Sequence, residues 1–147
     1  TGAPGSDNYA LKAFSATDAW VGGLACLNES CGGRKITLAR RVGQEWVNML
    51  PETWDGRVLA IDGVASTDVW ALGDYGDLQQ GYLRAWHWDG VQLTAHAIPA
   101  AMNGVAMVTA TDGWAVGPKG AIIHWDGTAW RPYVPLLRQT YLPLTHR

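Results

Sequence analysis

Residues 122–130, IIHWDGTAW, place side chains that could do chemistry within a short stretch. An imidazole close to a carboxylate could move a proton or contribute to a metal site. An exposed tryptophan beside an aspartate suits a sugar, because the indole can stack on the sugar ring while the carboxylate accepts hydrogen bonds from its hydroxyls. Residues 84–93, RAWHWDGVQL, repeat the His-Trp-Asp-Gly arrangement. The candidate ligand-binding residues are Trp88, Asp89, Trp125, Asp126 and Trp130, together with Tyr75 from the loop at 74–81.

A turn explains the same residues without any chemistry. Asp126 and Gly127 lie between two runs of β-forming and aromatic residues, and Asp-Gly in that setting is typical of a β-hairpin. A two-residue type I′ turn needs positive φ at both central positions, which Asp tolerates and Gly adopts freely. We therefore predict a type I′ turn here.

Catalytic and metal-binding patterns are not found in the sequence. A glycosidase needs two carboxylates about 5–10 Å apart across one cleft. The acidic residues here are either turn residues of the repeat described below or single loop residues, such as Glu29, Glu45, Glu52 and Asp77. No His-x-His, His-Glu-x-x-His, Gly-x-Ser-x-Gly or phosphate-loop motif occurs. We expect no enzyme, no metal and no cofactor, and keep a glycosidase fragment as a distant alternative.

Composition narrows the class of partner. The 147 residues carry 11 basic and 13 acidic side chains, and no basic cluster is longer than Arg40-Arg41, which argues against a nucleic-acid surface. No run of about 18 apolar residues exists, so no membrane span is expected. The chain begins without Met and without a signal-peptide core, and we interpret it as a processed mature protein or a piece of a larger one. Nine Trp and 18 Gly against a single Phe are typical of a turn-rich β protein.

A threefold repeat predicts how these residues are positioned. Three segments align without gaps on Thr-Asp-x-Trp: SATDAWVGG at 15–23, ASTDVWALG at 65–73 and TATDGWAVG at 109–117. An apolar segment precedes each of them, and each is followed by a third segment, a turn glycine (Gly43, Gly90 or Gly127), a fourth segment and a proline. Each unit therefore predicts four short strands in roughly 45 residues, which is typical of propeller blades. We expect an all-β fold with three four-stranded propeller-type blades, at about 8–51, 57–99 and 103–135 of one domain (1–135), followed by a tail at 136–147.

A family resemblance supports this architecture. Residues 111–130, TDGWAVGPKGAIIHWDGTAW, resemble the blade repeat of photosystem II assembly-factor-like and related bacterial neuraminidase-repeat β-propellers, and the resemblance covers about residues 8–135. It implies a propeller-type fold. The neuraminidase Asp-box, Ser-x-Asp-x-Gly-x-Thr-Trp, is absent, so the resemblance does not imply sialidase activity. The segment HWDGTAW at 124–130 is also similar, more weakly, to the Trp-Asp-Gly-x-x-Trp of fucose-binding propeller lectins, which implies a carbohydrate ligand.

Residues that occupy the same position in each repeat unit are expected to have structural roles. Asp18, Asp68 and Asp112 are expected to accept backbone N–H bonds and close Asx-type turns. The tryptophans two residues later, Trp20, Trp70 and Trp114, are expected to pack between blades. Arg40, His87 and His124 share one position and are expected on the strand face, solvated or stacked, rather than around a metal.

Two loops are longer than their counterpart in the third unit, and they lie at 24–35 and 74–81. A constant scaffold with one elaborated end is typical of a binding surface. The first loop carries the only cysteines, Cys26 and Cys31, which we expect to form a disulfide worth about 2 kcal/mol, with two reduced thiols as the alternative. A disulfide indicates an oxidising compartment, so we expect an extracellular or cell-surface protein. Asn28 begins the sequon Asn-Glu-Ser and is a candidate glycosylation site.

The sequence thus predicts a non-enzymatic extracellular binding or assembly module, with a carbohydrate-binding lectin as the alternative. Propellers usually close with four to eight blades. Three blades leave two apolar faces open, so we expect a partial propeller or one completed by self-association, with surface proteins or glycans as other partners. The tail at 136–147 is expected to pair with a neighbouring sheet edge.

Overall fold

The computed structural model describes residues 6–50, 55–74, 76–77 and 82–134. The protein is all-β, as predicted: the described residues form strands and one short 3-10 helix. The predicted tail at 136–147 and Tyr75 lie outside the described residues. The elements are β1 (Asp7–Ser15), β2 (Asp18–Cys26), β3 (Arg34–Val42), β4 (Glu45–Asn48), β5 (Val58–Ala65), β6 (Asp68–Gly73), β7 (Gly76–Asp77), β8 (Tyr82–Trp88), β9 (Leu93–Ile98), β10 (Gly104–Thr109), β11 (Asp112–Val116), η1 (Pro118–Gly120), β12 (Ile122–Trp125) and β13 (Trp130–Pro132).

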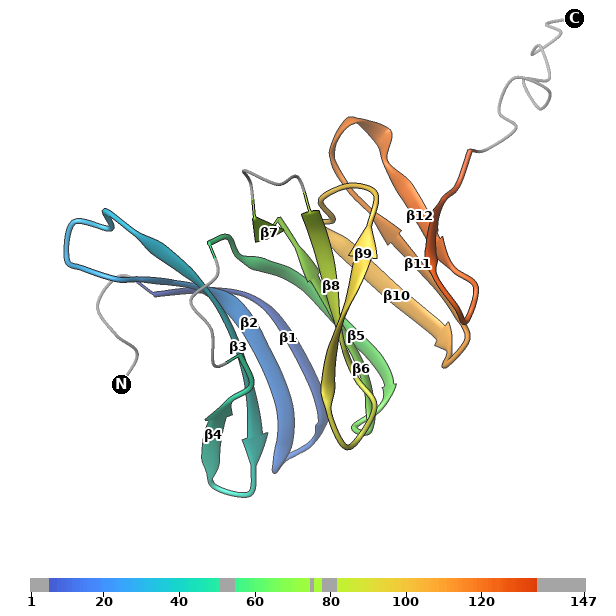
Figure 1. Cartoon of the computed structure of the whole chain (residues 1–147). Coiled ribbons are helices and arrows are strands. Elements are labelled where there is room, and N and C mark those ends of the chain that lie inside the picture. Colours follow the sequence, from blue (N-terminus) through green and yellow to red (C-terminus); the bar gives the residue numbers. More distant parts are fainter. Residues whose placement is uncertain (1–5, 51–54, 75, 78–81, 135–147) are drawn as a thin grey trace, which may run out of the picture.

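The strands form three antiparallel sheets that stand side by side (Figure 1). The first sheet has the order β1-β2-β3-β4 and the third the order β10-β11-β12-β13. The second sheet pairs β5, β6, β8 and β9 in the same way, and the two-residue β7 extends the pairing of β6 along β8. The predicted three groups of four strands are confirmed. Strand β5 packs against both β1 and β10, so the first strand of each sheet is its inner strand.

Each gap between sheets is filled by an apolar core. Trp20 and Leu38 of the first sheet are fully buried against Val58 and Ile61 of the second. The second core is built in the same way around Trp70, with residues of the third sheet on its other side. The expected packing of Trp20 and Trp70 between sheets is therefore confirmed, and this burial is what holds neighbouring sheets together.

One carboxylate joins all three inner strands. Asp62 on β5 forms an ion pair of 2.7 Å with Lys12 on β1, and its other oxygen accepts a 2.7 Å hydrogen bond from the backbone N–H of Met107 on β10. Burial alone would raise the pKa of Asp62, but the hydrogen bonds from Lys12 and Met107 lower it below its ordinary value. The ionised form is thus the one that the fold stabilises.

Asp62→Asn is expected to lower stability at neutral pH by about 1 kcal/mol, because Lys12 is partly exposed and its ion pair is screened. Since the pKa of Asp62 is lowered in the fold, its contribution is present above the ordinary value of about 3.9 and is lost as the pH falls through the lowered pKa. Urea titrations from neutral to acid pH should show the wild-type advantage shrinking with acid. Glu45→Gln, in an exposed side chain, is the control, and an Asp62→Asn deficit that does not change with pH would contradict the assignment.

The Asp-Gly turns differ from the prediction. Gly127 has φ of 89°, but Asp126 is not among the residues with positive φ. The N–H of Asp126 donates to the carbonyl of Ala129, which makes Gly127 the first of two central residues. Positive φ at the first central position alone is the pattern of a type II′ turn, so the predicted type I′ turn is wrong. Asp126 precedes the turn instead of forming its centre.

Gly127→Val is expected to destabilise the protein by more than about 1 kcal/mol, because a β-branched residue at positive φ is strained. A Cβ at Gly127 would also lie 3.0 Å from the Cβ of Thr111. Gly43→Val is the matched control, since Gly43 also has positive φ, at 65°, but no atom within 4 Å of an added Cβ. Thermal denaturation of both variants checks this, and equal losses would show that the contact with Thr111 has no effect.

The predicted disulfide between Cys26 and Cys31 is present. It closes the connection between β2 and β3, at the same end of the molecule as β7 (Figure 1). Inside the loop, the side-chain oxygen of Asn28 accepts hydrogen bonds from Ser30 and from the N–H of Gly32. In the part of the chain that is described, no helix has the length and apolarity needed to cross a membrane.

Candidate binding surface

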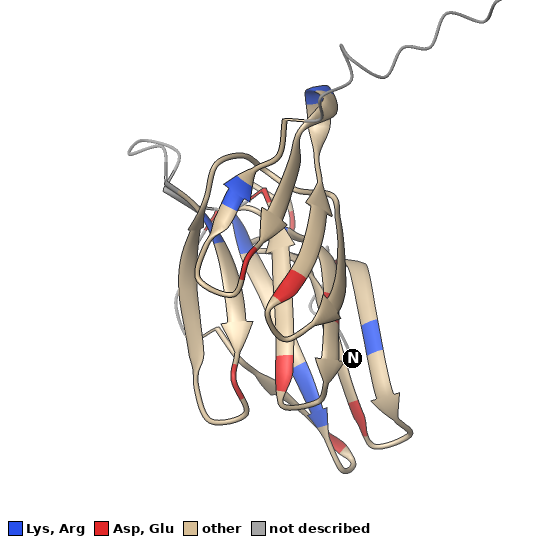
Figure 2. Ribbon diagram, turned by 90° about the vertical axis from the view of Figure 1, so that its right-hand side faces the viewer, with Lys and Arg blue, Asp and Glu red and all other residues tan. Residues whose placement is uncertain are grey.

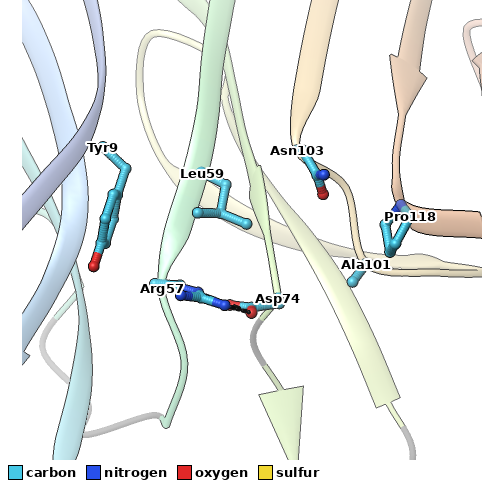
Figure 3. Close-up of a pocket in the computed structure, with 7 residues that line it drawn as sticks. All are labelled: Tyr9, Arg57, Leu59, Asp74, Ala101, Asn103 and Pro118. Atoms are coloured by element: carbon cyan, nitrogen blue, oxygen red, sulfur yellow. Dashed lines mark hydrogen bonds and ion pairs between the residues drawn. The ribbon is translucent and has the colours of Figure 1, made fainter.

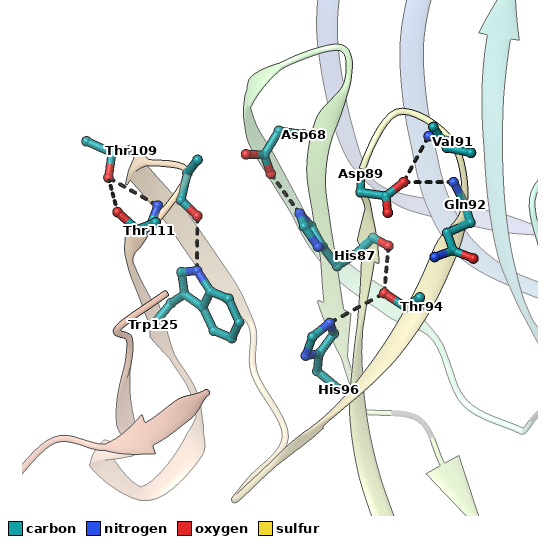
Figure 4. A network of polar contacts seen from close by, with 11 residues as sticks. Asp68, His87, Asp89, Val91, Gln92, Thr94, His96, Thr109, Thr111 and Trp125 are labelled. Atoms are coloured by element: carbon teal, nitrogen blue, oxygen red, sulfur yellow. Dashed lines mark hydrogen bonds and ion pairs between the residues drawn. The ribbon is translucent and has the colours of Figure 1, made fainter. Parts of the chain in front are cut away.

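The tryptophans predicted to bind a sugar are packed between sheets. Trp125 and Trp130 are 5% and 4% exposed, and the indole N–H of Trp125 donates to the carbonyl of Ala110 (Figure 4). Trp88 is partly buried in the core around Trp20, with ring centroids 5.9 Å apart. These rings offer little surface on which a sugar could stack.

The neighbouring aspartates are occupied by their own turns. Asp89 accepts the N–H groups of Val91 and Gln92 at 2.9 and 2.8 Å (Figure 4). Asp126 accepts the N–H and hydroxyl of Thr128 and also binds the guanidinium of Arg131. The hydroxyl of Thr128 and the Arg131 side chain, followed by the backbone donors, hold the pKa of Asp126 well below its ordinary range. Both carboxylates act as turn acceptors, Asp89 through Oδ1 and Asp126 through Oδ1, while Oδ2 of Asp126 binds Arg131.

The repeat aspartates bind the next strand instead of closing Asx turns. Asp18 forms two hydrogen bonds of 3.1 and 2.8 Å with Arg40, and the pKa of Asp18 is lowered mainly by this partner. Asp68 binds His87 at 2.8 Å, and Asp112 binds His124 at 2.7 Å. The expected Asx turns at these positions are therefore wrong. A hydroxyl group before the aspartate closes the turn instead. In the third sheet, for example, the hydroxyl of Thr109 accepts a hydrogen bond from the N–H of Thr111 (Figure 4).

Each of these pairs lies against the repeat tryptophan of its sheet. Arg40 is 5.6 Å from the ring of Trp20, close enough for a cation–π contact. The ring of His87 stacks on Trp70, with centroids 4.2 Å apart and planes 14° apart. The stacked histidine expected from the sequence is found here. Cross-strand pairing places the two residues opposite each other, because Trp70 pairs with His87 and the other two sheets repeat the register.

His96 on β9 was not singled out by the sequence. Its ring lies 5.0 Å from Trp70 and 5.6 Å from Trp125, and its Nε2 is 3.4 Å from the hydroxyl of Thr94 (Figure 4). Burial and, secondarily, the neighbouring His87 lower the pKa of His96. No repeat position signals this residue. Trp70 and Thr94 lie in its own sheet, and the packing of the third sheet on the second adds Trp125.

The third repeat tryptophan is covered differently from the other two. Trp70 is contacted by Trp125 and Trp130 of the next sheet, at 4.6 and 5.3 Å between centroids. The aromatic contacts of Trp114 within the described residues come from its own sheet, at His124 and Tyr133. The ion pair beside it is also more open: His124 and Asp112 are 32% and 46% exposed, against 20% and 19% for the pair beside Trp70. The third sheet therefore presents a face that no other sheet covers within the described residues.

We call this surface the open face. Its members lie on one side of the sheet because they pair across β11, β12 and β13. Val116 and Tyr133 are 51% and 46% exposed, which is a large apolar exposure for a sheet surface. Figure 2 views the molecule from this side and shows charged residues scattered along the strands rather than gathered in one region. The open face consists of Trp114, Val116, Ile122, His124 and Tyr133.

The first sheet has a complementary uncovered face at the other end of the row. Trp46 is 51% exposed. Its repeat equivalent Trp130, which follows its turn glycine at the same spacing, is buried. Leu11 is 68% exposed, although its repeat equivalent Ile61 is buried in the first core. Leu11 pairs with Val21, and Trp46 pairs with Arg41, so these side chains share one side of the sheet. We call Leu11, Val21, Arg41 and Trp46 the leading face.

Among the described residues, no three His, Cys, Asp or Glu side chains come together as metal ligands. A scan of the chain against protein-family models found no match, and a search of curated proteins found none either. The candidate surface therefore rests on its own geometry.

Proposed function

We propose that this protein is a non-enzymatic assembly module that associates head to tail, with the open face of one copy binding the leading face of the next. The observation that carries the proposal is the repeat tryptophan Trp114, whose aromatic contacts among the described residues come from its own sheet alone. In both internal interfaces the equivalent tryptophan is buried under residues of the following sheet. The leading face of a second copy would bury Trp114 in the same way.

The leading face carries the residues that this contact requires. Ile61 and Leu93 belong to the core around Trp20 or pack against it, and Val105 and Trp130 do the same in the core around Trp70. In the repeat alignment these positions correspond to Leu11 and Trp46 of the first sheet. Docking the leading face on the open face would therefore repeat an interface that the chain already makes twice within itself.

The blade-like repeat supports a propeller-type arrangement in the assembly. Three sheets are fewer than the four to eight blades of closed propellers, so two copies would supply six. A head-to-tail contact that does not close would instead grow into a filament. The disulfide supports an extracellular or cell-surface location for this assembly.

Complementary variants test the proposal. Trp114→Glu damages only the open face and Trp46→Glu only the leading face, because each puts a charge into an apolar contact. Each variant alone should remain monomeric, whereas an equimolar mixture should form a dimer that cannot grow, since one intact contact remains. Val91→Glu is the control, because Val91 is 85% exposed in a turn outside both faces.

Analytical ultracentrifugation of the single variants and of the mixture gives the result directly. Association that survives both single substitutions would overturn the proposal. So would a mixture that fails to dimerise while Val91→Glu still associates.

A further inference from the structure

A groove lies at one end of the inner strands and is lined by all three sheets (Figure 3). Its volume is about 510 Å³, within the range of small-molecule sites. Asp74 directly follows β6 and Pro118 follows β11 after Gly117, so the groove lies at the end where β6 and β11 finish. Its lining residues are Tyr9, Arg57, Leu59, Asp74, Ala101, Asn103 and Pro118.

Backbone irregularities lie at the groove. The pairing of β1 with β2 shifts register between Asn8 and Ala10, so Tyr9 sits in a bulge. Leu59 sits in an equivalent bulge of β5, between Val58 and Ala60. Asn103 holds the same repeat position just before β10. Bulges redirect side chains and are common beside functional sites, and here they occur where the three sheets meet around the groove.

The polar groups of the groove are paired in charge. Arg57 and Asp74 form hydrogen bonds of 2.8 to 3.1 Å and are 40% and 34% exposed. The guanidinium of Arg57 lies 6.0 Å from the ring of Tyr9, so an aromatic ring stands beside the ion pair. The amide of Asn103 lies across the groove from them (Figure 3). The site thus combines donors, acceptors and a ring face with no net charge.

We propose that this groove binds a neutral polyhydroxylated ring, that is, a carbohydrate. Asp74 would repel an anion and Arg57 a cation, whereas hydroxyl groups can donate to Asp74 and accept from Arg57. Asn103 can do both, and the C–H face of a sugar ring suits the ring of Tyr9. This site is separate from the open and leading faces, so it does not depend on association.

The test is a ¹H–¹⁵N NMR titration of the full chain with the methyl glycosides of glucose, galactose, mannose and N-acetylglucosamine. At least one sugar should shift the amides around Tyr9, Arg57 and Asn103. Tyr9→Ala should weaken that binding about tenfold, and Val91→Ala, at an exposed residue outside the groove and outside both faces, should leave it unchanged. Thermal melts show whether both variants are folded, which is expected because Tyr9 is 45% exposed.

Repeating the titration with Trp114→Glu separates this site from the proposed assembly, since sugar binding should persist in a monomer. Three results would overturn the assignment: no shift with any of the four sugars, shifts that centre on Trp88 and Trp125, or tighter binding of acetate or sulfate than of the sugars.

Discussion

Trp70→Ala is expected to lower the free energy of unfolding by about 3–5 kcal/mol. Trp70 is fully buried between the second and third sheets, where it contacts His87, Trp125 and Trp130. Removing the indole takes away apolar burial on both sides and leaves a cavity that rigid sheets can close only in part. Urea denaturation followed by circular dichroism measures the loss.

Trp114→Ala is the matched control, because Trp114 holds the same repeat position on the open face. At concentrations too low for association its loss should be much smaller than that of Trp70→Ala, since no sheet in the described part of the chain covers it from the other side. Equal losses would mean that the open face is covered within a single chain.

Gly22→Ala is expected to destabilise the protein by about 1–3 kcal/mol, because it separates the first two sheets. A Cβ at Gly22 would lie 2.4 Å from the Cγ1 and 2.7 Å from the Cβ of Val58, which is itself fully buried. Val58 is β-branched and has few alternative rotamers, so the sheets must move apart. Gly22→Val should cost more.

Gly104→Ala is the control for this effect. It is also a strand glycine, but its added Cβ would meet one methyl group of Val116 at 3.2 Å, and Val116 is half exposed and can move. A Gly22→Ala variant as stable as Gly104→Ala would show that the first two sheets are not in tight contact.

The repeat pattern allowed the strands and the packing of Trp20 and Trp70 between sheets to be predicted, because apolar residues recur at the same positions in each unit. The partners of the repeat aspartates were missed for a physical reason. Asp18 and Arg40 are 22 residues apart, and only the cross-strand register brings them together. The bulges at Tyr9 and Leu59 were also missed, since the local residue pattern around them does not mark an extra residue.

The candidate site shows what alternation along a strand can and cannot predict. Alternation places Trp125 and His124 on opposite sides of the third sheet, but it does not say which side is covered. A sheet between two others has no free side, so exposure depends on the place of the unit in the row. Trp130 is buried and Trp46 is half exposed for this reason alone, although the repeat gives them the same position. Trp46 belongs to the first unit of the row, whose outer side faces no other unit among the described residues. Comparing its place with that of Trp130 would therefore have indicated that Trp46 is exposed.

The most direct measurement is the mass of the wild-type chain in solution by sedimentation equilibrium at micromolar concentration. Head-to-tail association predicts a mass that is a multiple of the 15.9 kDa chain and that falls to one chain in Trp114→Glu. A wild-type protein that stays at 15.9 kDa across the concentration range would contradict the account.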